Sequence, residues 1–194
     1  MEPVIQTYSG KKFDPLNPRA EDICIEDIAH ALSLKCRFGG HCTSFYSVAQ
    51  HSVLASSIAE AQQGSTEMQL WALLHDAAEA YLPDVATPIK HFLQFEKKLG
   101  EWFVSVSFKY VEEMILEKIA QVFCFPSPPM PELIKEIDLR MVATERQQLM
   151  SEGFVWGGLL GVDSYKIPII SWSPAEAEIS FLMRFRSLQA SREY

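Results

Sequence analysis

The sequence contains few cysteines, and their spacing matches no common zinc or disulfide pattern. The four are Cys24, Cys36, Cys42 and Cys124, and no two of them have Cys-x-x-Cys spacing. Zinc ribbons and redox motifs depend on closely spaced pairs, and small disulfide-stapled domains on a denser cysteine framework. The pattern therefore indicates neither a zinc ribbon nor a disulfide framework.

Long apolar runs and a secretory leader are also missing. No apolar stretch approaches the roughly 20 residues that a membrane-spanning helix needs. The N-terminal sequence MEPVIQTYSGKK has no basic start followed by an apolar core, which is the pattern of a secretory signal. We therefore expect a cytoplasmic protein that does not associate with a membrane.

The chain has no excess of positive charge. It has 17 Lys and Arg residues against 25 Asp and Glu residues, which gives a formal net charge of −8. A protein that binds a nucleic-acid polymer needs a basic face, so we do not expect such a partner. A small anionic substrate is compatible with this charge if a metal ion or a few Arg and Lys side chains lie at the site.

What the sequence does contain is enough apolar material for one folded domain over residues 1–194. Of its 194 residues, 48% are hydrophobic and 22% are charged. Apolar residues recur at helical spacing, so we expect an all-α helical bundle behind a short irregular arm with a hairpin at Ser9-Gly10. Helices are expected at residues 21–34, 47–64, 66–82, 94–123, 131–150 and 173–189, with another short one near Pro88.

Polar residues at segment ends support two of these helices. Ser47 can cap the second helix, and Ser173 with Glu176 forms a capping-box pattern at the start of the last one. The segment 151–172 is glycine-rich and apolar, without a clear helical period. This segment and the expected long helix 94–123 are the two segments that could supply an interface between copies of the chain.

Three of the expected helices place ionisable side chains on otherwise apolar faces. One carries His51, the next carries the consecutive residues His75 and Asp76, and a later one carries Asp138. Helices that pack around one core bring such faces together. Two imidazoles and two carboxylates suit a divalent transition metal such as Mn, Co, Fe, Ni or Zn. The sequence therefore predicts one divalent ion, which supplies the partner that buried charges need.

Two further carboxylates follow the His-Asp pair. Glu79 lies one turn after His75 on the same helical face, and Asp84 comes just after the expected end of that helix. Both are candidates to position water or to act as general acid or base beside the metal. His75 and Asp76 point about 100° apart on a continuous helix, so the ion has to sit against the helix edge.

Each of these residues taken alone also has an ordinary explanation. A single buried histidine such as His51 is more often hydrogen-bonded in a core than bound to a metal. An aspartate in a charged helix, such as Asp138, is usually solvated, and the His75-Asp76 pair could form a polar seam between helices. The ordered combination of all four residues on three inward faces is more specific than any one of them.

At these residues the sequence resembles the HD-domain metal phosphohydrolases, which are named for a His…His-Asp…Asp ligand set on a helical core. The stretches YSVAQHS, LLHDAAEAYLPDVATPIK and EIDLRMVATE are similar to those of the YfbR-like 5′-deoxynucleotidases and most of all to their phage relatives, the DatZ-type dATP phosphohydrolases. The resemblance covers most of residues 8–150. It implies a metal-site core within about 25–150 and a homo-oligomer, a dimer or larger. It does not extend to the C-terminal loop and helix at 151–194.

The resemblance gives the metal-ligand role to the four residues named above and the acid/base role to Glu79 and Asp84. It also adds three candidate substrate-binding residues. Arg37, in the loop before the first ligand helix, would hold phosphate. Phe38, where relatives often carry tryptophan, would stack on the base or sugar. Lys90, in a Thr-Pro-x-Lys segment, would face phosphate, although a solvated lysine on a short helix is an equal alternative.

The activity that the resemblance implies is removal of phosphate from deoxynucleotides in a bacterial or phage-infected cytoplasm. The products would be a deoxynucleoside and phosphate, or a longer phosphate chain from a di- or triphosphate, with dAMP or dATP the expected substrate. Three alternatives stay open: an HD hydrolase of cyclic nucleotides or alarmones, a non-catalytic metal-binding sensor, and a helical interaction protein without a metal. Glu79 and Asp84 argue against the sensor, because a structural metal site needs no extra acids.

Overall fold

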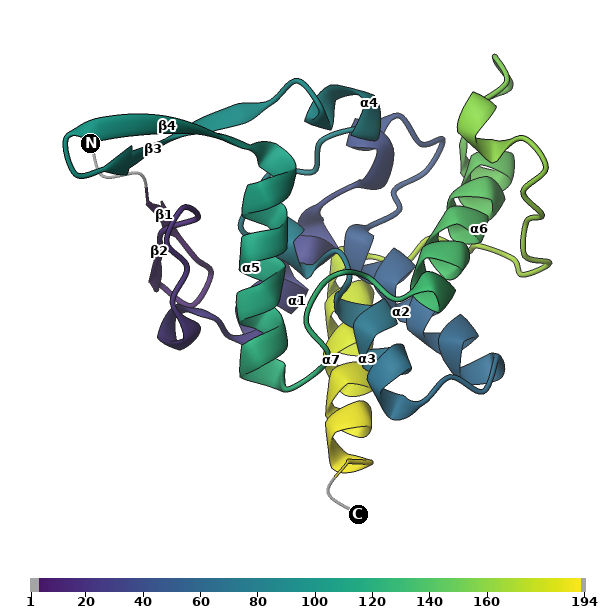
Figure 1. The fold of residues 1–194 in the computed structure, drawn as a ribbon. Helices are drawn as coiled ribbons and strands as arrows, with labels where there is room; N and C mark the ends of the chain where they lie inside the picture. Colours follow the sequence, from purple (N-terminus) through teal and green to yellow (C-terminus); the bar gives the residue numbers. More distant parts are fainter. Residues whose placement is uncertain (1–3, 193–194) are drawn as a thin grey trace.

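The computed structural model describes residues 4–192, which form a helical body with two small β-hairpins (Figure 1). The expected helical fold with an N-terminal hairpin is therefore correct for the body and for the first hairpin, whereas the second hairpin, over residues 94–107, was not expected. The helices are α1 (Ile25–Leu34), α2 (Val48–Ala61), α3 (Thr66–Leu74), α4 (Thr87–Lys90), α5 (Phe108–Phe123), α6 (Glu132–Leu149) and α7 (Pro174–Ala190). The strands are β1 (Ile5–Gln6), β2 (Lys12–Phe13), β3 (Gln94–Leu99) and β4 (Trp102–Ser107).

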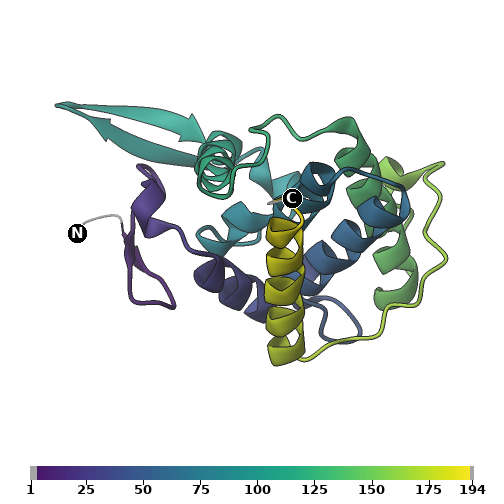
Figure 2. The same cartoon turned by 90° about the horizontal axis from the view of Figure 1, so that it is seen from below.

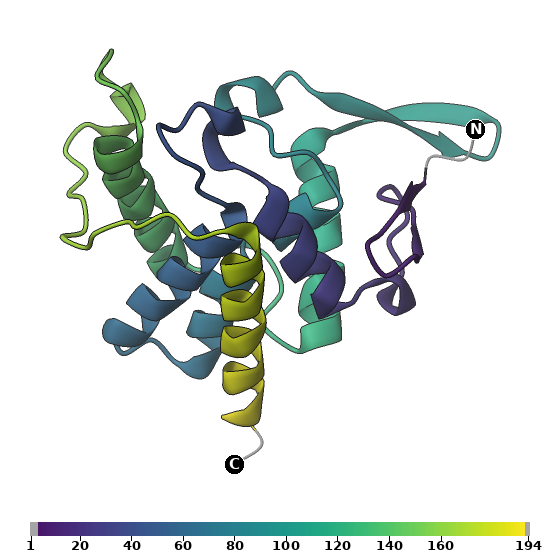
Figure 3. The same cartoon turned by 180° about the vertical axis from the view of Figure 1, so that it is seen from behind.

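Helix α2 is the element around which the body packs. It contacts α1, α3, α6 and α7, and α7 covers α1, α2 and α3 on the side shown in Figure 3. The largest fully buried side chains in this core include Trp71, Tyr46, Phe13, Phe108 and Phe181. Because α2 lies against both α3 and α6, polar residues on the facing sides of these three helices are brought into one place.

The caps expected from the sequence hold the ends of two helices. Ser47 accepts a hydrogen bond from the backbone N–H of Gln50 at the start of α2. At the start of α7, Ser173 and Glu176 form the complete capping box. The cap fixes the direction of the first turn of α2, which carries His51.

The helix expected at 66–82 is interrupted in the middle. Helix α3 ends at Leu74, and a separate 3-10 turn spans Ala77–Ala80. His75 Nδ1 donates to the carbonyl oxygen of Ala72 at 2.7 Å, a side-chain bond of the kind that competes with the helical ladder. The interruption removes the constraint that consecutive helical residues point about 100° apart, so His75 and Asp76 are free to face the same centre.

The long helix expected at 94–123 is correct only for its second half. Residues 94–107 form the antiparallel hairpin β3–β4, with Leu99 paired to Trp102 across a two-residue turn. Apolar and polar residues alternate only over Val104–Ser107 of β4, and Gly100 takes the left-handed conformation (φ 61°) that short hairpin turns favour. The helix starts at Phe108, after Ser107 caps it. Figure 2 shows the hairpin projecting away from the helical body.

The N-terminal arm contains the expected hairpin. Strands β1 and β2 pair antiparallel around the turn that includes Ser9 and Gly10, and Ser9 donates to the Asp27 carboxylate from both its backbone N–H and its hydroxyl. Residues 1–3 of the arm lie outside the described residues. Within residues 4–192, no helix is both long and apolar enough to cross a membrane.

Candidate metal centre

Three of the four predicted metal ligands converge between α2, the end of α3 and α6. The Nε2 atoms of His51 and His75 are 3.2 Å apart. Asp138 Oδ1 lies 3.3 Å from His51 Nε2 and 3.7 Å from His75 Nε2. These three ligand atoms all lie within 4.8 Å of one another. The predicted convergence of three helical faces is therefore present in the fold.

The spacing of these atoms matches the ligand sphere of one divalent ion. Two ligands that each lie about 2.1 Å from an ion are about 3.0 Å apart at a right angle and about 3.4 Å apart at the tetrahedral angle. The separations of 3.2 and 3.3 Å fall within that interval, and the third, 3.7 Å, lies above it. The group is compatible with a divalent metal, and its imidazole and carboxylate donors suit several transition ions.

The two imidazole rings are oriented by partners on their far sides. His51 Nδ1 lies 2.5 Å from Glu145 Oε1, and His75 Nδ1 lies 2.7 Å from the carbonyl oxygen of Ala72. Both acceptors favour a hydrogen on Nδ1, which leaves the Nε2 lone pairs directed at the centre. Two bare lone pairs 3.2 Å apart repel each other, so the arrangement requires a shared positive centre, either a cation or a proton.

Asp76 lies at the edge of this group rather than inside it. Its Oδ2 atom is 3.4 Å from His75 Nε2 and 3.9 Å from His51 Nε2, and it also pairs with Arg37 Nη1 at 3.2 Å. The guanidinium of Arg37 reaches Glu145 as well, at 3.1 Å. Arg37 therefore joins the fourth predicted ligand to the carboxylate that orients His51.

The predicted acid/base residues lie on the other side of Asp76, around the 3-10 turn. Glu79 is buried, and its Oε1 atom is 3.4 Å from Lys90 Nζ. Its Oε2 atom is buried and has no hydrogen-bond partner among the described residues. Lys90 is not a free solvated lysine, since it also pairs with Glu112 at 2.7 Å. Sequence reasoning gave no sign of Glu112, which α5 brings in from a distant segment.

Electrostatics make this region attractive to a cation. Burial and, after it, the charges of Asp76 and Asp84 raise the pKa of Glu79 to about 8, and they outweigh the lowering by Lys90 and Arg37. Burial lowers the pKa of His75, but the charge of Asp76 and the hydrogen bond to Asp138 outweigh it and raise that pKa to about 9. The negative charge of nearby carboxylates contributes to both shifts, and a bound cation would offset that contribution.

The two sides of the group differ in exposure. The side chains of His51 and His75 are 0% and 1% exposed, whereas those of Asp76 and Asp138 are 22% and 35% exposed. The imidazoles thus form the floor of the group, and the carboxylates form its solvent side. An ion held there would be reachable from solution, which is the arrangement of a site with an open coordination position rather than of a closed structural site.

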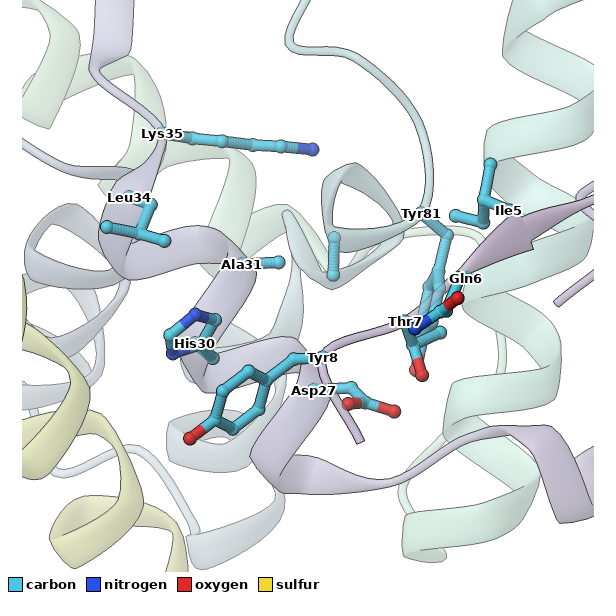
Figure 4. A pocket seen from close by; sticks show the side chains of 11 residues that line it. Ile5, Gln6, Thr7, Tyr8, Asp27, His30, Ala31, Leu34, Lys35 and Tyr81 are labelled. Atoms are coloured by element: carbon cyan, nitrogen blue, oxygen red, sulfur yellow. The ribbon is translucent and has the colours of Figure 1, made fainter. Parts of the chain in front are cut away.

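A cavity of about 410 Å³ lies elsewhere, between the N-terminal hairpin, α1 and the 3-10 turn (Figure 4). Tyr8 stacks on His30 at its edge, with a centroid distance of 3.7 Å, and Tyr81 and Lys35 also line it. None of the predicted metal ligands borders this cavity. The candidate site is therefore the solvent side of the histidine–aspartate group and not this cavity.

Comparison with known proteins places the chain in a family without assigning an activity. No family model matches it. The uncharacterized protein YfdR of Escherichia coli (strain K12) is 38% identical to it over 193 residues, which cover 97% of each chain. The chain belongs to the YfdR family. A second uncharacterized protein, from Rhodobacter capsulatus, is 48% identical over 86 residues, which are 42% of this chain and 44% of that protein.

In this member of the YfdR family, sequence reasoning missed two residues of the site, Glu145 and Tyr46. Glu145 is fully buried and accepts a hydrogen bond from the Tyr46 hydroxyl at 2.9 Å, in addition to its contacts with His51 and Arg37. One signal was available, since Glu145 follows Asp138 by two helical turns and so lies on the same face of α6. Tyr46 had no such signal, because only the folded loop brings it near.

Proposed function

We propose that this protein is a metal-dependent phosphohydrolase that acts on deoxynucleotides. The observation that carries the proposal is the convergence of two oriented imidazoles and a carboxylate with a solvent-facing side, next to a buried acid and a lysine. The substrate class rests on the resemblance to the 5′-deoxynucleotidase and DatZ-type enzymes. The expected reaction releases a deoxynucleoside from dAMP, or from dATP with a longer phosphate chain as the second product.

His51, His75, Asp76 and Asp138 would hold the ion, and a bound divalent ion supplies a Lewis acid for the phosphoryl oxygen and an acidified water. Glu79 is buried beside the proposed ion, and in the metal-free protein this burial is the main cause that raises its pKa. It is therefore suited to protonate the leaving oxygen. We assign to Asp84, whose charge contributes to that pKa, the orientation of the attacking water.

The predicted phosphate-binding residues have partners in the substrate-free protein. Arg37 holds Asp76 and Glu145, and Lys90 holds Glu79 and Glu112. In the proposed mechanism Arg37 has a positioning role, because it orients the carboxylates of Asp76 and Glu145. Its Nη1 atom, which pairs with the partly exposed Asp76, is the atom that would reach a phosphate oxygen.

The test is phosphate release by the protein after metal removal and reloading with Mn, Co or Zn. Substrates are the four deoxynucleotides and their ribose counterparts, each as mono- and triphosphate, with products separated by chromatography. Asp138→Asn should lose metal and activity, whereas Asp163→Asn, an exposed aspartate outside the site, should keep both. Release of a deoxynucleoside that depends on metal and on Asp138 is the expected result.

Other outcomes of this assay would point to the alternatives. Turnover of cyclic nucleotides or guanosine alarmones, but not of deoxynucleotides, would move the protein to a sister hydrolase class. Tight metal binding without turnover of any phosphate ester would indicate a sensor. A protein that binds no divalent ion would be left as a helical interaction protein, and the proposal would be wrong.

A further inference from the structure

The chain segment after α6 carries two aromatic residues toward the loop that precedes α2. Trp156 meets the Phe38 ring edge-on, with centroids 5.9 Å apart and planes at 62°. Phe154 stacks beside Trp156 at 6.4 Å. The guanidinium of Arg146, on α6, lies 5.6 Å from the Trp156 ring centroid. We refer to Phe38, Phe154 and Trp156 as the aromatic cluster.

The aromatic cluster continues directly from the candidate metal centre. The guanidinium carbon of Arg37 lies 5.5 Å from the Phe38 ring centroid, and the same guanidinium pairs with Asp76 at 3.2 Å. One ion pair and two ring contacts therefore connect Asp76 to Trp156. A ligand with its phosphate at the metal centre and an aromatic group at the other end would have a matching surface at each end.

The two segments that build the cluster are fastened to each other. The backbone N–H of Thr43 donates to the carbonyl oxygen of Leu149 at 2.7 Å, and the hydroxyls of Ser44 and Ser171 are 2.8 Å apart. Figures 1 and 3 both show the loop before α2 lying beside the end of α6 and the chain that follows it. The cluster is therefore assembled before any ligand binds.

Two features of the aromatic cluster are unfavourable for the free energy of the folded protein unless a ligand binds there. Phe154 is 78% exposed and the adjacent Val155 is 70% exposed, so a large apolar surface faces water beside the site. Phe38 has a φ of 56°, which is uncommon for a bulky residue and concentrates at functional sites. Both features are accounted for if an apolar, planar ligand group covers the rings.

We propose that Trp156 lies against the nucleobase of the substrate and thereby extends, from the segment after α6, the stacking surface that the family resemblance predicts at Phe38. This inference rests on the proposed function and gives the segment after α6 a part in substrate binding. Stacking on aromatic side chains accepts any base, because every base has a π-face. A purine covers more ring area than a pyrimidine, so the cluster favours purine deoxynucleotides by contact area rather than by hydrogen bonding.

The experiment compares a substrate that has a base with one that lacks it. Binding of dAMP and of 2-deoxyribose 5-phosphate to the Mn-loaded protein is measured by calorimetry. Trp156→Leu keeps an apolar side chain but loses the ring system, so it should weaken dAMP binding about tenfold and leave 2-deoxyribose 5-phosphate within twofold. Trp102→Leu is the matched control, since Trp102 is 78% exposed on the distant hairpin, and it should change neither affinity.

Trp156→Phe retains an aromatic face and should keep most of the dAMP affinity. Equal losses for both ligands in Trp156→Leu would mean that Trp156 only holds the loop, and would overturn the inference. An unchanged dAMP affinity would overturn it too, as would a wild-type protein that binds neither ligand. If dAMP binds with the expected dependence on Trp156 but no phosphate is released, the phosphohydrolase proposal fails while the stacking surface stands.

Discussion

Replacement of Glu145 by glutamine tests whether the candidate metal centre depends on the carboxylate behind it. Glu145 is fully buried and accepts hydrogen bonds from His51 Nδ1 at 2.5 Å, Tyr46 at 2.9 Å and Arg37 at 3.1 Å. Glutamine keeps the shape but removes the charge and turns one acceptor into a donor. Loss of such a carboxylate behind a ligating imidazole typically weakens metal binding about 10- to 100-fold, or about 1.4–2.7 kcal/mol.

The assay is a competition titration of Zn or Mn between the protein and a chromophoric chelator at fixed pH. Glu152→Gln is the control, because Glu152 is exposed and lies just beyond α6, and its affinity should match that of the wild type. Circular dichroism establishes that the Glu145→Gln protein is folded. A folded Glu145→Gln protein that binds metal within twofold of the wild type would refute the assignment of Glu145 as the group that orients His51.

Three further changes test the remaining groups. His75→Ala should abolish metal binding and phosphate release together; full metal stoichiometry would remove His75 from the ligand set. In the metal-free protein, burial and nearby carboxylates raise the pKa of Glu79 from 4.5 to about 8, so the folded state loses stability as pH rises through that interval. Metal-free Glu79→Gln should therefore melt above the wild type at pH 8 and near it at pH 4.5. Lys90→Ala removes a cation that lowers the pKa of Glu79, so the alkaline limb of the pH–rate profile should move to higher pH.

Capping residues, apolar spacing and turn residues predicted the elements whose ends are set by local sequence. Capping residues and apolar spacing located α2 and α7, and the Ser9-Gly10 turn located the first hairpin. The expected helix at 94–123 was wrong over 94–107, because short segments such as these fit either period and the one turn signal between them is a single residue, Gly100. The break after Leu74 depends on a side-chain hydrogen bond within the folded site, which no propensity encodes.

The sequence predicted those site residues that lie on the apolar face of a recognisable helix. His51, His75 and Asp138 could be brought together by reasoning that apolar faces converge, and the structure does bring them together. The partners of Arg37 and Lys90 could not be predicted, since both pair with carboxylates far away in the sequence. Trp156 lies in a segment without a clear period, where sequence gives no direction to a side chain.

An ion at the candidate metal centre would also link segments of the chain that are far apart in the sequence. An ion shared by His75, Asp76 and Asp138 would act as a cross-link in a protein whose four cysteines are all free. That cross-link closes a loop containing α4, the projecting hairpin and α5. Removal of the ion would open this cross-link and increase the conformational entropy available to the loop. Amide exchange in α6 and the loop should then accelerate together, while α1, α2, α3 and α7, which pack on one another, stay protected.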